Sequence, residues 1–237
     1  MKPKSIILLS GGLDSTVSAA IAVKKTSPLF ALTIDYGQRA AGMEILASKK
    51  ICRALKIKHK IIKLPFFKEF KKCLLIAGKK MLPPLKAERS LRHIPSPPGE
   101  ETSTHHTPSP PGGEGKGEGI DFWVPNRNAL FINIAACFAE YYNADLIVTG
   151  FNLEEAREFP DNTKDFINAI NKTLQFSTLN KVKVVSYVAN YTKREIYKLG
   201  LKYNAPMQHI YSCYLGGRKI CGKCPSCLKL KDAIKKY

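Results

Sequence analysis

The feature that most constrains the fold is a glycine turn that joins a short apolar run to a helix-forming run. Residues 5–9 predict a buried strand, residues 10–16 are Ser-Gly-Gly-Leu-Asp-Ser-Thr, and the small and β-branched side chains of residues 16–25 suit a helix packed on a sheet. The glycines permit a tight turn, and the N–H groups at the helix start, together with the hydroxyls, form a cradle for phosphate. The chain therefore begins as a strand–loop–helix unit with a candidate anion site.

The same alternation continues along the chain. Further strands are expected at residues 29–34, 60–64, 145–149 and 183–186, and helices at 43–55, 128–142 and 163–176. Thr192 to Glu195 form a capping box that opens another helix, which Gly200 is expected to end. Strands and helices at this spacing predict an α/β fold with a doubly wound parallel sheet.

Composition excludes several classes of protein. The chain has 237 residues, of which 44% are hydrophobic and 24% charged, so it is neither disordered nor collagen-like nor a small disulfide scaffold. The 38 Lys and Arg against 19 Asp and Glu give a net charge of +19, which fits a polyanion-binding protein or an enzyme with a lysine-rich surface. No run approaches the ~20 apolar residues of a membrane span, and no secretory signal is visible. We expect a cytoplasmic protein with no membrane partner.

A low-complexity segment interrupts the pattern. Residues 95–119 hold six Pro and six Gly, and include His105 and His106, which are expected to be solvated loop residues. Such a composition predicts a disordered insertion. The expected organisation is a first part of the nucleotide-binding domain at 1–94, the insertion at 95–119, the rest of the α/β domain at 120–204, and a metal-binding module at 205–237.

Four of the seven cysteines fall within the last 25 residues, at Cys213, Cys221, Cys224 and Cys227. Two successive two-residue spacers and a fourth thiol predict a closed site of four thiolates for structural Zn²⁺, with an iron–sulfur cluster as the rival. The other three, Cys52, Cys73 and Cys137, are expected to be small buried side chains.

The glycine loop differs from two common nucleotide-binding loops. It has no lysine of the kind that a Walker-A loop sends to the terminal phosphates, and it is not the GxGxxG of dinucleotide-binding proteins. Asp14 would place a negative charge beside a phosphate. That arrangement is reasonable if Mg²⁺ lies between them, or if Asp14 caps the helix instead.

The SGGLDS motif after the first strand resembles that of the PP-loop ATP pyrophosphatases. The resemblance implies an adenine nucleotide alpha hydrolase-like fold that binds ATP with its pyrophosphate in the loop and its α-phosphorus open to attack by a substrate oxygen. The residues that it places at the nucleotide are Leu9, Ser10, Gly11, Gly12, Leu13, Asp14, Ser15 and Thr16, with Mg²⁺ beside Asp14.

Five further motifs narrow the resemblance: DYGQR at 35–39, VPNRN at 124–128, VTG at 148–150, FPDN at 159–162 and CGKCPSC at 221–227. In this order they resemble the 7-cyano-7-deazaguanine synthases, a family of the queuosine precursor pathway. The resemblance implies a C–N bond-forming ligase that adenylates 7-carboxy-7-deazaguanine, admits ammonia to give the amide, and then activates and eliminates the amide oxygen to leave the nitrile. It also implies a homodimer.

The resemblance suggests roles residue by residue. The candidate catalytic residues are Asp14, Arg39 and Arg127, and the two arginines would bind phosphate or the substrate carboxylate. Asp35 would contact ribose or adenine, although it could simply form the turn after its strand. Asp161 would bind the edge of the deazaguanine, unless it caps the helix that follows. Surface arginine is the alternative for Arg39 and Arg127.

Two departures and two rival functions remain open. The family usually has His where Ala40 stands, and the insertion displaces a segment that precedes VPNRN.

A PP-loop enzyme of the tRNA thiolase or lysidine synthetase type would use the basic charge, since residues 49–80 hold twelve Lys or Arg against one Glu. However, there is no appended tRNA-binding domain and no spare cysteine pair, so we expect no nucleic-acid partner. A zinc-ribbon nucleic-acid binder is the non-enzymatic alternative, in which the glycine loop has no catalytic role.

Overall fold

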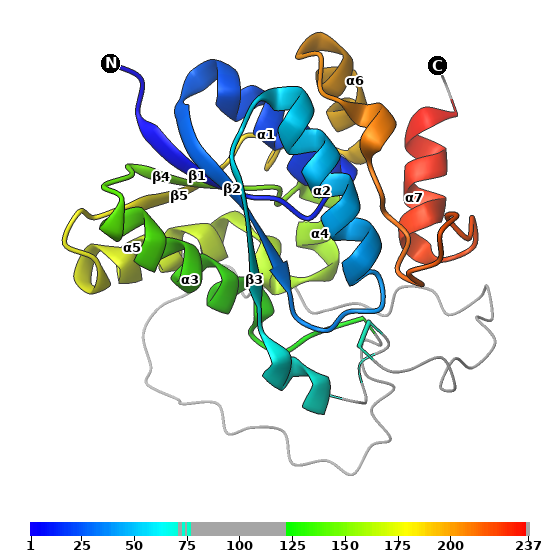
Figure 1. Ribbon diagram of the computed structural model, residues 1–237, viewed down its shortest axis with the longest axis horizontal. Coiled ribbons are helices and arrows are strands. Elements are labelled where there is room, and N and C mark those ends of the chain that lie inside the picture. The colour runs from blue at the N-terminus through cyan, green and yellow to red at the C-terminus, as the bar shows by residue number, and fades with distance from the viewer. Residues whose placement is uncertain (71–72, 74, 77–121, 236–237) are drawn as a thin grey trace, which may run out of the picture.

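The computed structural model describes residues 1–70, 73, 75–76 and 122–235, and the segment expected to be an insertion at 95–119 lies outside them. Its centre is a five-stranded sheet in the order β3-β2-β1-β4-β5, and every pairing is parallel (Figure 1). The strands are β1 (Lys4–Leu8), β2 (Ser27–Asp35), β3 (His59–Lys63), β4 (Leu146–Thr149) and β5 (Lys183–Ser186). The doubly wound parallel sheet is confirmed.

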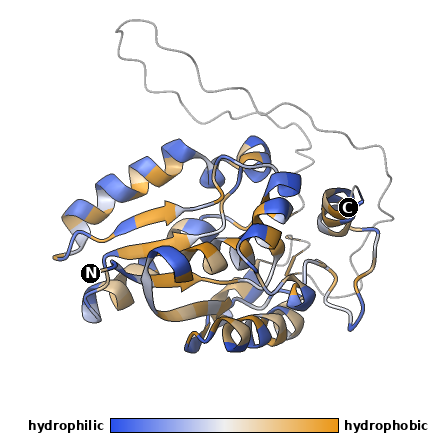
Figure 2. Ribbon diagram, turned by 90° about the horizontal axis from the view of Figure 1, so that it is seen from above, coloured by the Kyte–Doolittle hydropathy of each residue, from blue (hydrophilic) through white to orange (hydrophobic). Residues whose placement is uncertain are grey.

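Helices cover both faces of the sheet. One face carries α3 (Arg127–Tyr141) and α5 (Lys164–Ser177), and the other carries α1 (Leu13–Lys25) and α2 (Ala41–Leu55). The helix α6 (Lys193–Lys202) packs against α1, and α7 (Pro225–Ile234) packs against α6, while α4 (Leu153–Glu158) is a short helix after β4. Short 3-10 turns span Pro65–Glu69, Pro160–Asn162 and Met207–His209. Figure 2 shows the hydrophobic residues concentrated in the strands and on the helix faces turned toward them.

Alternation along the strands divides the core between these faces. Ile6 of β1 points into the core beneath α3 and α5, whereas its neighbour Ile7 points into the core beneath α1 and α2. Both side chains are fully buried. A strand that is buried on both faces has a nearly continuous apolar run, which is why the sequence of β1 shows no polar alternation after Ser5.

The order of the strands places the site. After β1 the chain adds β2 and β3 on one side, and it then returns to add β4 and β5 on the other, so β1 and β4 are adjacent at the point where the order reverses. In open parallel sheets, ligands bind beyond the carboxyl ends of the strands at this point. The glycine loop after β1 and Gly150 after β4 both lie there.

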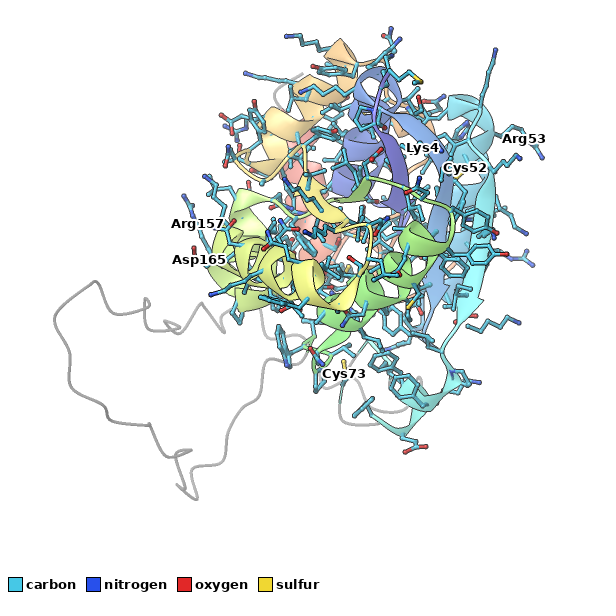
Figure 3. All side chains as sticks on the ribbon, turned by 90° about the vertical axis from the view of Figure 1, so that its left-hand side faces the viewer. Lys4, Cys52, Arg53, Cys73, Arg157 and Asp165 are labelled. Atoms are coloured by element: carbon cyan, nitrogen blue, oxygen red, sulfur yellow. The ribbon has the colours of Figure 1, made fainter. Side chains whose placement is uncertain are left out.

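Two expectations about local structure need correction. Gly200 does not end α6, which continues to Lys202. A Cβ at Gly200 would overlap the sulfur of Met207 and approach Val17, so this glycine permits close packing, and Asn204, with φ at 50°, follows the helix end. Cys137 is exposed, whereas Cys52 and Cys73, both labelled in Figure 3, are buried as expected, and none of the three belongs to the group of four cysteines.

The helices α4 and α7 were not expected from the sequence. The chain begins α4 at the side chain of Asn152, which accepts hydrogen bonds from the N–H groups of Glu154 and Glu155. In contrast, the capping box of Thr192 and Glu195 at the start of α6 is confirmed. Among the described helices, none is long and apolar enough to cross a bilayer.

Candidate active site and metal centre

The glycine loop is braced by its own side chains. Thr16 donates a hydrogen bond to the carbonyl of Gly12 (2.6 Å), and the hydroxyls of Ser10 and Ser15 lie 3.1 Å apart. Gly11 has φ at +83°, and a Cβ there would lie 2.9 Å from that of Ala47 on α2. Since no side chain of the described residues caps α1, the N–H groups of its first turn can bind an anion.

Gly150 lets β4 approach this loop closely. A Cβ on Gly150 would lie 2.7 Å from the backbone nitrogen of Ser15, so only glycine leaves room for the first turn of α1. The VTG motif is therefore a packing requirement of the loop. Thr149 before it is buried and accepts a hydrogen bond through its carbonyl from Ser18 (2.6 Å).

Asp14 lies in the first turn of α1 and is not its N-cap, which is Gly12. One carboxylate oxygen, Oδ2, accepts a hydrogen bond from Nζ of Lys193 (2.8 Å), whereas Oδ1 is buried without a partner among the described residues. Burial raises the pKa of Asp14, and the ammonium of Lys193 opposes that rise. A buried carboxylate oxygen without a donor is the expected ligand of a cation, so the residues present fit Mg²⁺.

Lys193 belongs to a chain of ion pairs that runs away from the loop. Its Nζ also contacts Glu155 (3.0 Å), and Lys229 on α7 contacts Glu155 (3.6 Å) and Glu158 (2.6 Å). Burial would lower the pKa of Lys193, but Asp14 and Glu155 raise it above its usual value. With Asp14, three carboxylates face two ammonium groups, which leaves the network with one excess negative charge.

A second group of polar residues lies around Arg127, the first residue of α3. Its Nη1 donates a hydrogen bond to the hydroxyl of Tyr36 (3.3 Å), and its Nε donates to the side chain of Asn128 (3.2 Å). Burial would lower the pKa of Arg127, but Tyr36 and Asp161 raise it. Burial raises the pKa of Tyr36 to about 12, so its hydroxyl stays protonated at neutral pH.

Asp161 lies opposite this arginine in the turn Pro160–Asn162. It does not cap α5, because Thr163 is the N-cap and accepts a hydrogen bond from the N–H group of Phe166. Burial raises the pKa of Asp161, and Arg127 opposes that rise. Its carbonyl accepts a hydrogen bond from the amide of Asn128 (3.3 Å), which ties the FPDN segment to the start of α3.

One cavity of about 290 Å³ joins the loop to this second group. It brings together most of the expected site residues, namely Leu9, Ser10, Gly12, Leu13, Asp14, Ser15, Arg127 and Asp161. Four others do not line it: Gly11 and Thr16, which shape the loop, and Asp35 and Arg39.

Asp35 and Arg39 have local contacts instead. The carboxylate of Asp35 accepts a hydrogen bond from the N–H group of Gly37 (3.1 Å), as a turn-forming residue does after a strand. The N–H group of Arg39 donates to the carbonyl of Leu75 (2.8 Å). The side chains of this motif that reach the cavity are Tyr36 and Gln38, and Gln38 donates to Glu44 (2.7 Å). Ala40 is a buried N-cap of α2 and also lines the cavity.

The four cysteines converge on one point, as the spacing predicts. Their sulfur atoms all lie within 4.8 Å of one another. Partial burial would raise the pKa of Cys221, but the N–H groups of Lys223 and Cys224, which donate to its sulfur, lower it to about 7. A set of four thiols in this arrangement could hold one metal ion.

The segment that carries the four cysteines is joined to the glycine loop. The N–H group of Tyr211 donates to the carbonyl of Gly11 (2.8 Å), and Ser212, Tyr214, Ser226 and Leu230 line the cavity. Gly216, with φ at +73°, packs directly on the backbone of Arg39. The cysteine module is therefore part of the wall of the cavity.

Comparisons with known proteins show the family of the chain. A model of the family described as "Queuosine biosynthesis protein QueC" matches residues 4–237. The chain belongs to this family. It is 44% identical over 230 residues to a 7-cyano-7-deazaguanine synthase of Carboxydothermus hydrogenoformans, and the match covers 97% of each chain. It is 40% identical to one of Methanosarcina mazei, over 98% of this chain and 94% of the relative.

A solved structure of a 4-thiouridine synthetase, in complex with RNA and with bound ATP, matches 99% of this chain and 51% of its own. The TM-score is 0.51 and the identity 16%, so the likeness concerns the fold alone. It confirms the α/β fold.

Sequence reasoning missed Lys193, Glu155 and Tyr36. Lys193 follows Thr192, the N-cap of α6. The one sequence signal for Lys193 was the TKRE motif, which predicts that a helix begins there. Nothing in the local sequence pairs it with Asp14, because 179 residues separate the two.

Proposed function

We propose that the protein converts 7-carboxy-7-deazaguanine and ammonia to 7-cyano-7-deazaguanine, with ATP as a co-substrate, as a ligase that forms a C–N bond. Family membership supports the synthase activity. The observation that carries the proposal is one cavity lined both by the glycine loop and by Arg127 and Asp161. Such a cavity suits the activation of a small carboxylate by ATP.

Different residues of the chain would bind the pyrophosphate portion of ATP and its Mg²⁺. The N–H groups at the start of α1 and the hydroxyls of Ser10 and Ser15 would bind the pyrophosphate portion. The unpartnered Oδ1 of Asp14 would bind Mg²⁺, which supplies positive charge against the charge that develops on the phosphates. Lys193, beside the same carboxylate, would add a second positive charge at the phosphates.

Arg127 and Asp161 would hold the second substrate. The guanidinium is fixed by Tyr36 and Asn128, and a guanidinium fork matches a carboxylate or a phosphate oxygen pair. The carboxylate of Asp161 would accept hydrogen bonds from the N–H groups of the deazaguanine edge. Arg39 and Asp35 have no such place in the cavity wall, so their proposed contacts with phosphate, ribose or adenine would need a rearrangement.

We propose Zn²⁺ for the four cysteines. Zinc–sulfur bonds of ~2.3 Å in a tetrahedron put the sulfur atoms about 3.8 Å apart. A mutual separation within 4.8 Å is close to that requirement. An iron–sulfur cluster would keep its cysteine sulfurs farther apart, since several iron and sulfide ions lie between them. The homodimer and the expected division at residues 95, 120 and 205 are further proposals, which rest on the resemblance and the composition.

The test is a reaction with purified protein, ATP, Mg²⁺, ammonium and 7-carboxy-7-deazaguanine, followed by mass spectrometry. The nitrile and AMP should both appear, and omission of ammonium should prevent the nitrile. ATP turnover that requires tRNA, with no nitrile from the free base, would favour the tRNA-modifying alternative. Tight binding of RNA without any ATP turnover would favour the zinc-ribbon alternative.

A further inference from the structure

Two aromatic rings in the cavity wall have no role in the arrangement described so far. Trp123 and Phe159 lie with their ring planes only 13° apart and their centroids 6.1 Å apart. Both line the cavity, and both are half-buried. Neither belongs to the phosphate cradle or to the ion pairs of Lys193.

The same two segments carry the polar residues of the substrate end. Trp123 directly precedes the VPNRN motif that contains Arg127, and Phe159 is two residues before Asp161. The segments are tied together, because the amide of Asn128 donates to the carbonyl of Asp161 (3.3 Å). The N–H group of Arg127 also donates to the carbonyl of Val124 (3.3 Å). The two rings and the carboxylate therefore form one connected part of the wall.

This combination of groups selects a class of ligand. Aromatic side chains stack on flat heteroaromatic bases, and a neighbouring polar group then distinguishes the edge of the base. An ionised carboxylate only accepts hydrogen bonds. The edge of a 7-deazaguanine offers two donors, the ring N–H and the exocyclic amine, whereas the corresponding edge of adenine offers one donor and one acceptor. Asp161 therefore suits a deazaguanine better than the adenine of ATP.

We propose that Trp123 and Phe159 form an aromatic subsite on which the deazaguanine ring stacks while Asp161 accepts the hydrogen bonds of its edge. The inference rests on the proposed function, of which it specifies the substrate end. It separates the cavity into a base subsite of FWVPNRN and FPDN and a nucleotide subsite at the glycine loop.

Trp123 makes a direct test possible, because it is the chain's one tryptophan. Its fluorescence should be quenched saturably by 7-carboxy-7-deazaguanine in the absence of ATP, and Mg²⁺-ATP alone should give no comparable quenching. Replacement of Phe159 with Leu removes one ring, and the fluorescence titration should then give a dissociation constant about tenfold higher. Phe176→Leu is the matched control, because Phe176 is 85% exposed on α5 and should leave the titration unchanged.

Turnover gives a second measurement. Trp123→Phe keeps an aromatic face and should retain most of the activity, whereas Trp123→Leu should raise the KM for the deazaguanine about tenfold with a smaller change in kcat. A variant that merely disturbed the fold would also raise the KM for ATP, and Trp123→Leu should not.

The outcomes separate the two proposals. Saturable quenching by ATP but not by the deazaguanine would overturn the base subsite and assign the rings to adenine. Nitrile formation with no quenching by either ligand would also overturn it. Saturable quenching by the deazaguanine in a protein that forms no nitrile would support the subsite and overturn the proposed reaction.

Discussion

The glycine loop and the cysteine module meet in one wall of the cavity, yet they depend on different sources of order. The loop lies between β1, α1 and β4, and Gly11 and Gly150 let backbones approach there that any side chain would separate. The described part of the cysteine module, residues 205–235, contributes no strand to the sheet, and its three buried cysteines join the core formed by α1 and α2. The loop is thus shaped by the sheet, whereas the order of the module would depend on the zinc ion that we propose for its four sulfurs.

The comparison predicts that the module is the more fragile part. Replacing Cys224 with Ser should remove about one equivalent of bound zinc and lower the Tm by about 10 °C or more, since binding of structural zinc contributes ~10–16 kcal/mol in isolated zinc-finger peptides. Metal content by elemental analysis and a thermal melt measure both effects. ATP turnover should fall as well, because Tyr211 and Gly216 connect the module to the loop and to Arg39.

Cys137→Ser is the control for that experiment, because Cys137 is exposed on α3 and lies outside the group of four. Its metal content and Tm should match those of the unaltered protein. A Cys224→Ser protein that keeps a full equivalent of zinc and an unchanged Tm would show that the tetrad is not the metal site.

The loop should show the opposite behaviour, with a large loss of activity and little loss of stability. Asp14→Asn keeps the shape of the side chain, and Lys193 retains its contact with Glu155 at 3.0 Å. The variant lacks the charge that would bind Mg²⁺, so formation of AMP should fall about 100-fold or more while the Tm changes by only a few degrees. Asp165→Asn is the control, since Asp165 is exposed at the start of α5, on the outside of the molecule (Figure 3). Retained AMP formation in Asp14→Asn would contradict a metal-linked role.

These two regions are also where the sequence was most informative. Both are local motifs. A strand followed by two glycines is enough to predict the loop, and two-residue spacers are enough to predict that the cysteines converge. The doubly wound sheet follows from the regular alternation of apolar runs in the same way. Arg127 and Asp161 were expected to bind the substrate because their motifs resemble those of the family, although no local rule states that their segments meet.

The misses have a common physical cause. Lys193, Tyr36 and the ring pair of Trp123 with Phe159 function through contacts between segments that are far apart in the sequence, and hydrophobic periodicity carries no information on such pairs. The sequence suggests a helix end at Gly200 because glycine commonly ends helices, whereas here it allows Met207 to pack closely. The sequence also suggests a buried Cys137, but the face of α3 that bears it is exposed.

The ion pairs that join the two regions make the stability of the protein depend on pH. Burial would raise the pKa of Glu155, but Lys193 and Lys229 lower it below its usual value of 4.5. A lowered carboxylate pKa contributes stability that is present above pH 4.5 and is lost as the pH falls through the folded-state value. Glu155→Gln should therefore lower the free energy of unfolding by about 2 kcal/mol at neutral pH, by an amount that shrinks below pH 4.5.

Chemical unfolding of both proteins across the pH range measures this difference, and Glu69→Gln, at an exposed position, is the control. Loss of zinc in acid affects both proteins, so it cancels in the difference between them. A difference that grows as the pH falls below 4.5 would contradict the ion-pair network.

The smallest effect should come from Lys229, which connects α7 of the module to α4. Its Nζ contacts Glu158 at 2.6 Å and Glu155 at 3.6 Å, but its side chain is 24% exposed, so solvent screens these ion pairs. Lys229→Met should therefore lower the free energy of unfolding by about 1 kcal/mol. The cysteines are unchanged in this variant, so zinc should remain fully bound.

The same variant also tests whether α7 orients Lys193 through Glu155. If it does, the KM for ATP should rise about twofold to fivefold in Lys229→Met, while kcat changes less. Lys231→Met, at an exposed position on the same helix, should leave both constants unchanged. An unchanged KM in Lys229→Met would mean that the module supports the loop only through the backbone contacts of Tyr211 and Gly216, and that the two regions are electrostatically independent.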